Sequence, residues 1–124
     1  MNTINLKHEA SLLTELWTPR VVGEMNDQFV KVAKLHGEFT WHKHEAEDEL
    51  FLVLEGNPII EYRESRVVLG VGDMHVVPRG TMHNPHCDEV CLVALLEPKT
   101  TQHTGDTVSD LTVSVADQLH PSKA

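Results

Sequence analysis

The sequence predicts an all-β protein, built as a sandwich or a closed barrel of short strands. Apolar and β-branched runs recur at short intervals from residue 29 onward. Residues that favour turns separate these runs, and this alternation is typical of all-β domains. The separating segments are Gly37, residues 45–48, residues 56–58, residues 70–73 and residues 78–80.

A short helix is predicted before the strands, over residues 9–17. Its apolar residues Leu12, Leu13, Leu16 and Trp17 have helix-like spacing, and Pro19 would end it. We expect this helix to pack against the outside of the barrel or against a neighbouring subunit.

Strands are predicted over residues 29–35, 38–44, 49–55, 58–63, 66–70, 74–78 and 89–97. Residues 50–54 and 92–96 are apolar at every position, so both faces of these strands should be buried. This pattern favours a homodimer, in which one face lines the barrel and the other meets a partner or the terminal segments. The polar tail after Pro98 includes an extended stretch at residues 111–115, which would cover the barrel edge or swap onto a neighbour.

Two histidines lie in the strand predicted over residues 38–44. Alternate side chains of a strand share a face, so His42 and His44 project together, roughly 6.6 Å apart along the strand. Residues 45–48 are of types depleted in strands, and a turn there would bring Glu49 beside the histidines. His83 follows the turn at residues 78–80 and would come from a third strand.

Three imidazoles and a carboxylate suit Zn²⁺, Fe²⁺, Mn²⁺, Ni²⁺, Co²⁺ or Cu²⁺, with bonds of about 2.0 to 2.2 Å for zinc. We therefore expect one divalent transition metal per chain. The expected ligands are His42, His44, Glu49 and His83. Glu45, Glu47 or Asp48 could replace Glu49. Four protein ligands leave one or two positions on a five- or six-coordinate ion for water, substrate or O₂.

The two histidine segments resemble the paired motifs of the cupin superfamily. The first reads G-x4-H-x-H-x4-E-x6-G, from Gly37 to Gly56, and the second reads G-x5-P-x-G-x2-H, from Gly72 to His83. Fifteen residues separate them, as in small microbial single-domain cupins. The resemblance covers about residues 30–98 and implies a double-stranded β-helix, or jelly-roll, barrel.

The resemblance also implies the metal ligands, at the positions that match the motifs. These are His42, His44, Glu49 and His83. The sequence departs from the family pattern twice, because four residues rather than five precede His42, and Cys87 stands where the second motif commonly ends in Asn. Neither departure removes a ligand.

The chain has 124 residues and a formal net charge of −9. We expect one domain over residues 1–124, with a barrel core at about 28–98, a helix and arm at 1–27 and a C-terminal arm at 99–124. The acidic charge argues against nucleic acid or an anionic membrane as partner, since both attract clustered cations. No apolar run is long enough to span a bilayer and no secretory signal begins the chain, so we expect a cytoplasmic protein with a small-molecule ligand.

Other titratable residues have plainer interpretations. His75 falls within its strand and is expected to be a packed or interface histidine. His86 is the best of the remaining histidines for a proton-transfer role beside the ligands. Arg63 and Arg79 are expected at the surface or in turns, although either could receive an anionic substrate.

The two cysteines are expected to be free thiols. Cys87 and Cys91 would lie about 13 Å apart in an extended segment, which is too far for a disulfide. The alternative is that Cys87 faces the metal or substrate cavity as a soft ligand or reactive thiol.

The fold alone does not name a reaction, because the resembled family includes dioxygenases, isomerases, decarboxylases, sugar-binding regulators and storage proteins. We expect a metal-dependent protein that acts on a small oxygenated metabolite by dioxygenase or isomerase chemistry. Phosphosugar isomerisation is the weaker enzymatic option, since no basic cluster lies near the motifs to hold a phosphate. The alternative is a non-catalytic metal-dependent binding or sensor module, which the absence of a recognisable general base keeps open.

Overall fold

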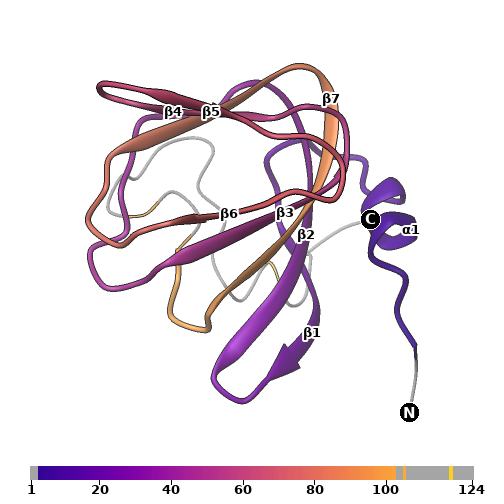
Figure 1. Ribbon diagram of the computed structural model, residues 1–124. Coiled ribbons are helices and arrows are strands. Elements are labelled where there is room, and N and C mark those ends of the chain that lie inside the picture. Colours follow the sequence, from indigo (N-terminus) through magenta and orange to yellow (C-terminus); the bar gives the residue numbers. More distant parts are fainter. Residues whose placement is uncertain (1–2, 103–104, 106–117, 119–124) are drawn as a thin grey trace.

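A computed structural model of the chain describes residues 3–102, 105 and 118 (Figure 1). Its elements are α1 (Leu6–Ser11), β1 (Arg20–Met25), β2 (Gln28–Glu38), β3 (Glu49–Glu55), β4 (Ile59–Tyr62), β5 (Arg66–Val68), β6 (Met74–Val77) and β7 (His83–Pro98). All of the paired strands are antiparallel. The predicted all-β fold with a short N-terminal helix is confirmed.

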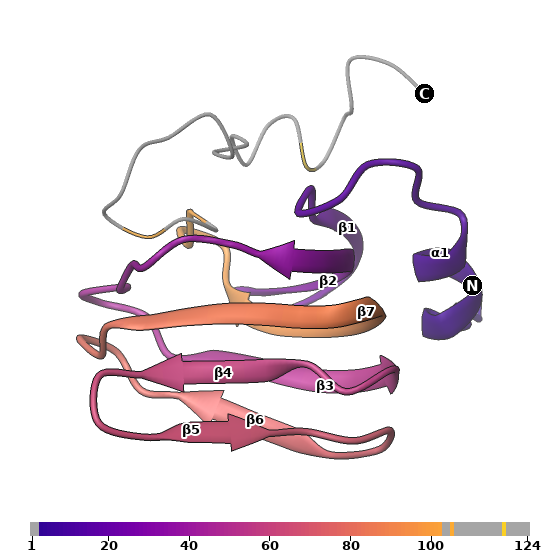
Figure 2. The same cartoon turned by 90° about the horizontal axis from the view of Figure 1, so that it is seen from above.

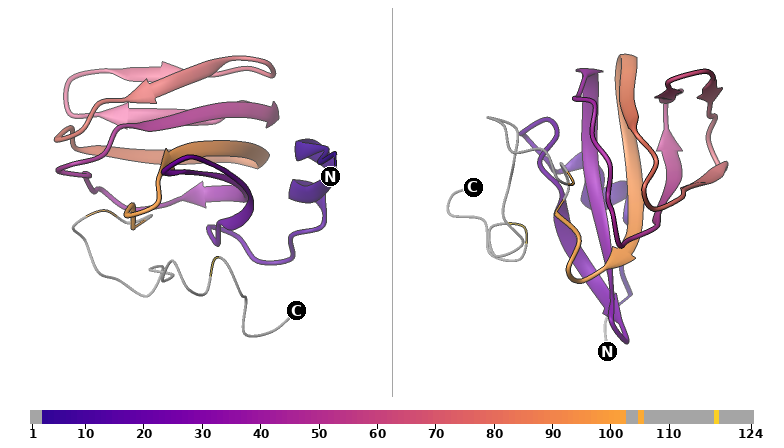
Figure 3. Two further views of the ribbon diagram at one scale, coloured as in Figure 1. Left: turned by 90° about the horizontal axis from the view of Figure 1, so that it is seen from below. Right: turned by 90° about the vertical axis from the view of Figure 1, so that its left-hand side faces the viewer.

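The long strand β7 organises the sheet. One edge of β7 pairs with β2, while the other edge pairs first with β4, from residue 83 to 86, and later with β3, from residue 92 to 96. β1, β6 and β5 extend the sheet beyond β2, β3 and β4 respectively. The strands curl round a common interior (Figures 1 and 3), as a double-stranded β-helix does.

The interior is filled by alternate residues of the strands. The core members on the strands are Ala33, Leu35, Phe51, Val53, Ile60, Val77, Cys87, Cys91, Val93 and Leu95. Residues between them face outward, because successive side chains of a strand point to opposite faces. The barrel therefore has one apolar interior, shared by all the long strands.

The N-terminal segment covers part of the outer face. α1 lies outside the sheet (Figure 2), and Ala10 packs with Val32, Leu92 and Ala94 in a second apolar cluster. This contact explains why residues 92–94 are buried on both faces within one chain.

The helix predicted over residues 9–17 is displaced toward the N-terminus, to Leu6–Ser11. The side chain of Asn5 caps its first turn. Trp17 cannot continue a helix, because its φ is 57°. Instead its backbone N–H donates to the Lys34 carbonyl and its indole N–H donates to the His36 carbonyl, each at 2.9 Å. These tertiary hydrogen bonds override the helical spacing of the apolar residues.

The prediction of a strand over residues 38–44 is wrong. β2 ends just after Gly37, whose φ of 77° favours glycine, and residues 39–48 form a loop. Within this loop, His42 makes an isolated antiparallel bridge to His83. β1 was not predicted, and a register shift near Gly23 interrupts its pairing with β2.

Within the described part of the chain, no helix has the length and hydropathy of a membrane span. The extended stretch predicted at residues 111–115 lies outside the described residues.

Candidate metal centre

Three segments bring four side chains together in the barrel interior. His42 and His44 come from the loop after β2, Glu49 begins β3, and His83 begins β7. One ligand atom from each lies within 4.8 Å of all the others. All four residues are at most 3% exposed. The structure thus assembles the group of residues that the sequence singled out.

Backbone hydrogen bonds hold these segments in place. The N–H of His42 donates to the His83 carbonyl at 3.0 Å, and the reverse bond measures 2.9 Å. The N–H of Gly80 donates to the His44 carbonyl at 2.7 Å. The turn before β7 is therefore tied to the histidine loop at two points, which positions the imidazoles without a regular strand.

Two of the imidazoles are oriented by threonine carbonyls. Nδ1 of His42 lies 2.8 Å from the Thr40 carbonyl, and Nδ1 of His83 lies 2.9 Å from the Thr81 carbonyl. A carbonyl can only accept, so Nδ1 carries the proton and the lone pair of Nε2 is left for another partner. Sequence reasoning missed this repeated T-x-H pattern, which the sequence does contain.

The donor atoms fit a divalent metal. Both ring nitrogens of His44 and Nε2 of His83 are buried without a hydrogen-bond partner among the described residues. Oε1 of Glu49 lies 3.6 Å from Nε2 of His44 and 3.8 Å from Nε2 of His83. These distances are long for hydrogen bonds, but they approach the spacing of about 3 to 3.5 Å between two atoms bound to one ion.

The protonation states also suit a metal. Burial, followed by the neighbouring His83, lowers the pKa of His42 to about 4. Burial alone would raise the pKa of Glu49, but the neighbouring imidazoles of His44 and His83 hold it well below its usual range. At neutral pH the group therefore offers a neutral His42 imidazole and an ionised carboxylate, the forms that bind metals.

The alternative carboxylates lie elsewhere. Glu45 pairs with Lys43 at 2.9 Å, while Glu47 and Asp48 form hydrogen bonds at the surface. None of these three belongs to the buried group. Among the described acidic residues, Glu49 is the carboxylate that joins the histidines.

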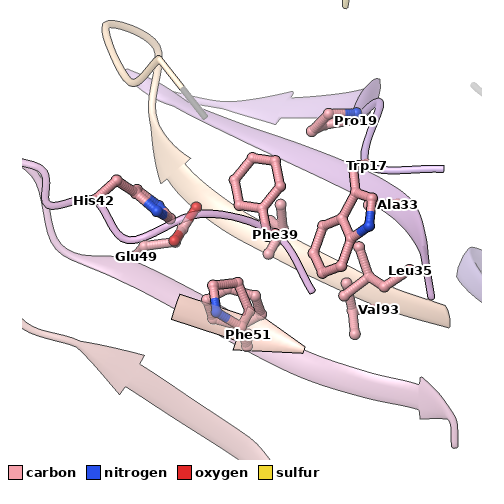
Figure 4. A pocket seen from close by; sticks show the side chains of 11 residues that line it. Trp17, Pro19, Ala33, Leu35, Phe39, His42, Glu49, Phe51 and Val93 are labelled. Atoms are coloured by element: carbon pink, nitrogen blue, oxygen red, sulfur yellow. The ribbon is translucent and has the colours of Figure 1, made fainter. Parts of the chain in front are cut away.

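An apolar cavity of about 30 Å³ adjoins this group (Figure 4). His42 and Glu49 lie at one end of it and Trp17 at the other. Its other lining residues are Pro19, Ala33, Leu35, Phe39, Phe51, Pro85, Val93 and Leu95. Its size suits one or two water-sized molecules, and its walls offer them few hydrogen bonds. The cavity thus gives the metal group a small apolar neighbour.

A tyrosine and a histidine lie beside the metal group. Tyr62 and His75 follow the interior faces of β4 and β6, because the side chains two positions away, Ile60 and Val77, belong to the core. The Tyr62 hydroxyl is 2.6 Å from Nε2 of His75, and the Tyr62 ring centroid is 6.4 Å from that of His83. His75 is therefore packed inside the protein, as expected, and its ring is held by a hydrogen bond with Tyr62. The sequence analysis did not single out Tyr62.

Both members of this pair are uncharged at neutral pH. Burial, followed by the charge of Glu49, raises the pKa of Tyr62. Burial, followed by His83, lowers the pKa of His75. The hydroxyl and the imidazole therefore form a neutral hydrogen bond next to the candidate metal site.

Three further candidates stand apart from this group. Nε2 of His86 lies 3.1 Å from Oε1 of Glu61. The guanidinium of Arg63 stacks over the Trp41 ring at 4.1 Å from its centroid, and Arg79 does not line the apolar cavity.

Cys87 and Cys91 are both free and buried. Burial, followed by the neighbouring Cys91, raises the pKa of Cys87. Neither thiol belongs to the metal group. The structure therefore places Cys87 in the core rather than among the ligands.

A family model described as a cupin domain matches residues 28–97, which is more than half of the chain. The chain belongs to the cupin superfamily. Cupins commonly bind metals, and the buried group of this cupin can hold one.

Solved structures resemble this cupin over most of its length. A cupin-2 domain protein from Shewanella frigidimarina is 42% identical, with a TM-score of 0.74, over 77% of this chain and 93% of that one. Protein NMB1881 from Neisseria meningitidis is 28% identical, with a TM-score of 0.71, over 78% of this chain and 99% of that one. KdgF from Halomonas sp. is 29% identical, with a TM-score of 0.58, over 64% of this chain and 77% of that one.

A curated relative matches a shorter part of the cupin. The uncharacterized protein YdbB of Bacillus subtilis (strain 168) is 41% identical over 63 residues, which are 50% of this chain. The match spans 56% of the length of YdbB.

Proposed function

We propose that this cupin binds one divalent transition metal and acts on a small oxygenated metabolite in the cytoplasm, by dioxygenase- or isomerase-type chemistry. The proposed ligands are His42, His44, Glu49 and His83. The observation that carries the proposal is their buried convergence within 4.8 Å, with imidazole nitrogens that have no other described partner. When bound, the metal supplies a Lewis acid for a substrate oxygen or, if redox-active, a site for O₂ activation.

The chain's own residues would orient a substrate around this group. The apolar walls of the cavity offer water few hydrogen-bond partners next to His42 and Glu49, and their low polarity strengthens electrostatic interactions there. The cavity also suits a small uncharged part of a substrate. On the side of His83, the Tyr62 hydroxyl, held by His75, is placed to exchange a hydrogen bond with a substrate oxygen.

Phosphosugars remain the weaker substrate class. Among the residues that the structure describes, no lysine or arginine lines the apolar cavity. The buried Lys31 is paired with Glu97, and Arg63 is stacked on Trp41. A phosphate would need several cations arranged around it, so neutral diols, enols and thiols are the better substrates to test.

The experiment that tests this function is metal analysis of untagged protein purified without chelator. About one metal ion per chain supports the proposal, and no metal after reconstitution refutes it. Iron, copper or nickel would lead to O₂-uptake assays with small diols, enols and thiols, whereas zinc or manganese would lead to isomerase assays. A non-catalytic binding or sensor module would show saturable affinity without product.

We also propose that this cupin forms a homodimer through the outer face of β3 and β6. Met74 and Val76 of the edge strand β6 are 59% and 40% exposed, and they pair with the partly exposed Leu52 and Leu50 of β3. Val76→Lys should make the protein monomeric, and the molar mass from light scattering coupled to gel filtration measures this change. Val90→Lys, at a 39% exposed position on β7, is the matched control. A monomeric wild type would refute the dimer.

A further inference from the structure

A buried ion pair lies in the same interior as the metal group. Lys31 of β2 and Glu97 of β7 are both completely buried, and Nζ of Lys31 is 2.7 Å from Oε1 of Glu97. Burial removes two charges from water, and their attraction offsets this cost only in part. Apolar residues of similar size would often be at least as stable. A contribution to stability therefore does not by itself explain why these two charged residues lie in the interior.

The strand register places the pair next to a proposed metal ligand. β2, β7 and β3 lie side by side (Figure 2). Pairing of β2 with β7 sets Lys31 two residues from the position opposite Glu97. On the other edge of β7, the pairing of Leu50 with Leu96 sets Glu49 opposite Glu97. Lys31, Glu97 and Glu49 thus form one row across three neighbouring strands.

The two carboxyl groups in this row lie next to each other. Glu49 and Glu97 are 3% and 0% exposed, and both follow the interior faces of their strands, because Phe51 and Leu95, two positions away, belong to the core. Glu97 therefore has Lys31 on one side and the proposed ligand on the other.

We propose that Glu97, held by Lys31, is a positioning residue that fixes the Glu49 carboxylate toward the three histidines. The inference rests on the proposed metal site and adds two residues outside the ligand set. A glutamate side chain has several rotatable bonds, so a ligand carboxylate without such a partner must be ordered when the metal binds. Partners that orient metal ligands are typically worth ten- to hundredfold in affinity.

Two double variants distinguish a positioning effect of Glu97 on Glu49 from an effect of charge and from a loss of protein stability. Lys31→Met with Glu97→Leu removes both charges and the contact to Glu49. Lys31→Met with Glu97→Gln also removes both charges, but an amide at residue 97 can still donate a hydrogen bond to Glu49. Because both variants replace the ion pair by neutral side chains, neither leaves a buried charge without its partner.

The measurement is the affinity for Co²⁺, by chelator competition, together with the visible absorption spectrum of the bound ion. We expect the Glu97→Leu double variant to bind Co²⁺ ten- to hundredfold more weakly and to change its spectrum. The Glu97→Gln double variant should stay within about threefold of the wild type. The chelated Glu97→Leu variant should melt no lower than the wild type, because apolar replacement of a buried pair is often neutral or stabilising.

The same substitutions at an exposed ion pair provide the control. Lys7 and Glu55 are 3.7 Å apart, with side chains 61% and 50% exposed. Lys7→Met with Glu55→Leu should leave both the affinity for Co²⁺ and the spectrum unchanged.

Other results would overturn the proposal. Wild-type affinity in both double variants would show that Glu97 does not position Glu49, and an equal loss in both would assign the effect to charge. If the double variant His42→Ala with His44→Ala bound Co²⁺ as tightly as the wild type, the proposed metal site would itself be refuted. That result differs from a loss confined to the residue 97 variants.

Discussion

His42 and His83 face each other across an isolated antiparallel bridge, with imidazole centroids 4.3 Å apart. Their backbones exchange two hydrogen bonds, at 3.0 and 2.9 Å. This pairing joins the two histidine segments through the polypeptide itself. A site that is organised in this way loses less conformational entropy when a ligand binds.

Removal of metal should therefore lower stability without unfolding the barrel. A ligand present at 100 times its Kd stabilises a folded protein by about 2.7 kcal/mol. We expect protein treated with chelator to keep its far-UV circular dichroism and to melt at a lower temperature, which added metal restores. Loss of the β-sheet signal on chelation would contradict a preorganised site.

Replacement of two ligands should abolish metal binding. His42→Ala with His44→Ala removes two of the three imidazoles, and we expect less than a tenth of the wild-type metal content by mass spectrometry. His36→Ala is the matched control, because His36 is exposed and outside the metal group. Unchanged occupancy in the double variant would refute the site.

Acid should destabilise the chelated protein through His42. Its pKa is lowered from 6.5 to about 4 in the folded state, so the unfolded chain binds the proton first. Protonation then favours unfolding as pH falls below about 6.5, and the full loss, reached near pH 4, is about 3 kcal/mol. Urea unfolding from pH 7.5 to 4 measures it. His42→Gln should flatten the pH dependence, and His8→Gln, at an exposed position, should not.

Much of the site could be predicted because its residues sit in short motifs with fixed spacing. His42 and His44 meet with ring centroids 5.1 Å apart, although the strand expected to align them is a loop. The predicted convergence of the two histidines holds although the predicted strand is wrong, because hydrogen bonds of the loop and of the bridge to His83 align the side chains. Periodicity cannot show such bonds, since they join residues far apart in the chain.

Other features depend on tertiary contacts that a pattern does not encode. Trp17 has helical spacing, yet its hydrogen bonds to β2 hold it at a φ of 57°. The sequence pattern gave no reason to pair Lys31 with Glu97, because a charged residue inside an apolar strand is usually expected to face outward. The register of β2 and β7 brings the two side chains together in the interior.

The cysteines should be unreactive in the native protein. Burial raises the pKa of Cys87 and of Cys91, so both remain protonated near pH 8, and the thiol is a poor nucleophile. We expect a disulfide reagent to modify neither residue in native buffer within minutes and both at once in denaturant. Rapid native modification, abolished in Cys87→Ser, would instead place that thiol at an accessible site.

Trp17 should stabilise the barrel and support the metal centre. Its ring stacks on Phe39 at 4.7 Å between centroids, and Phe39 contacts the His42 ring edge-on at 5.4 Å. Trp17→Ala removes this stack and enlarges the apolar cavity, so we expect a loss of about 3 to 5 kcal/mol in the free energy of unfolding. Metal affinity should also fall, because Phe39 would no longer be held against His42.

The control is Leu16→Ala, at a neighbouring position that is 41% exposed, which should lower the free energy of unfolding by less than about 0.5 kcal/mol. Urea unfolding and metal titration of the two variants measure both effects. Equal stability of the two variants would show that the stack contributes little, and loss of stability with unchanged metal affinity would show that Trp17 acts on the fold alone.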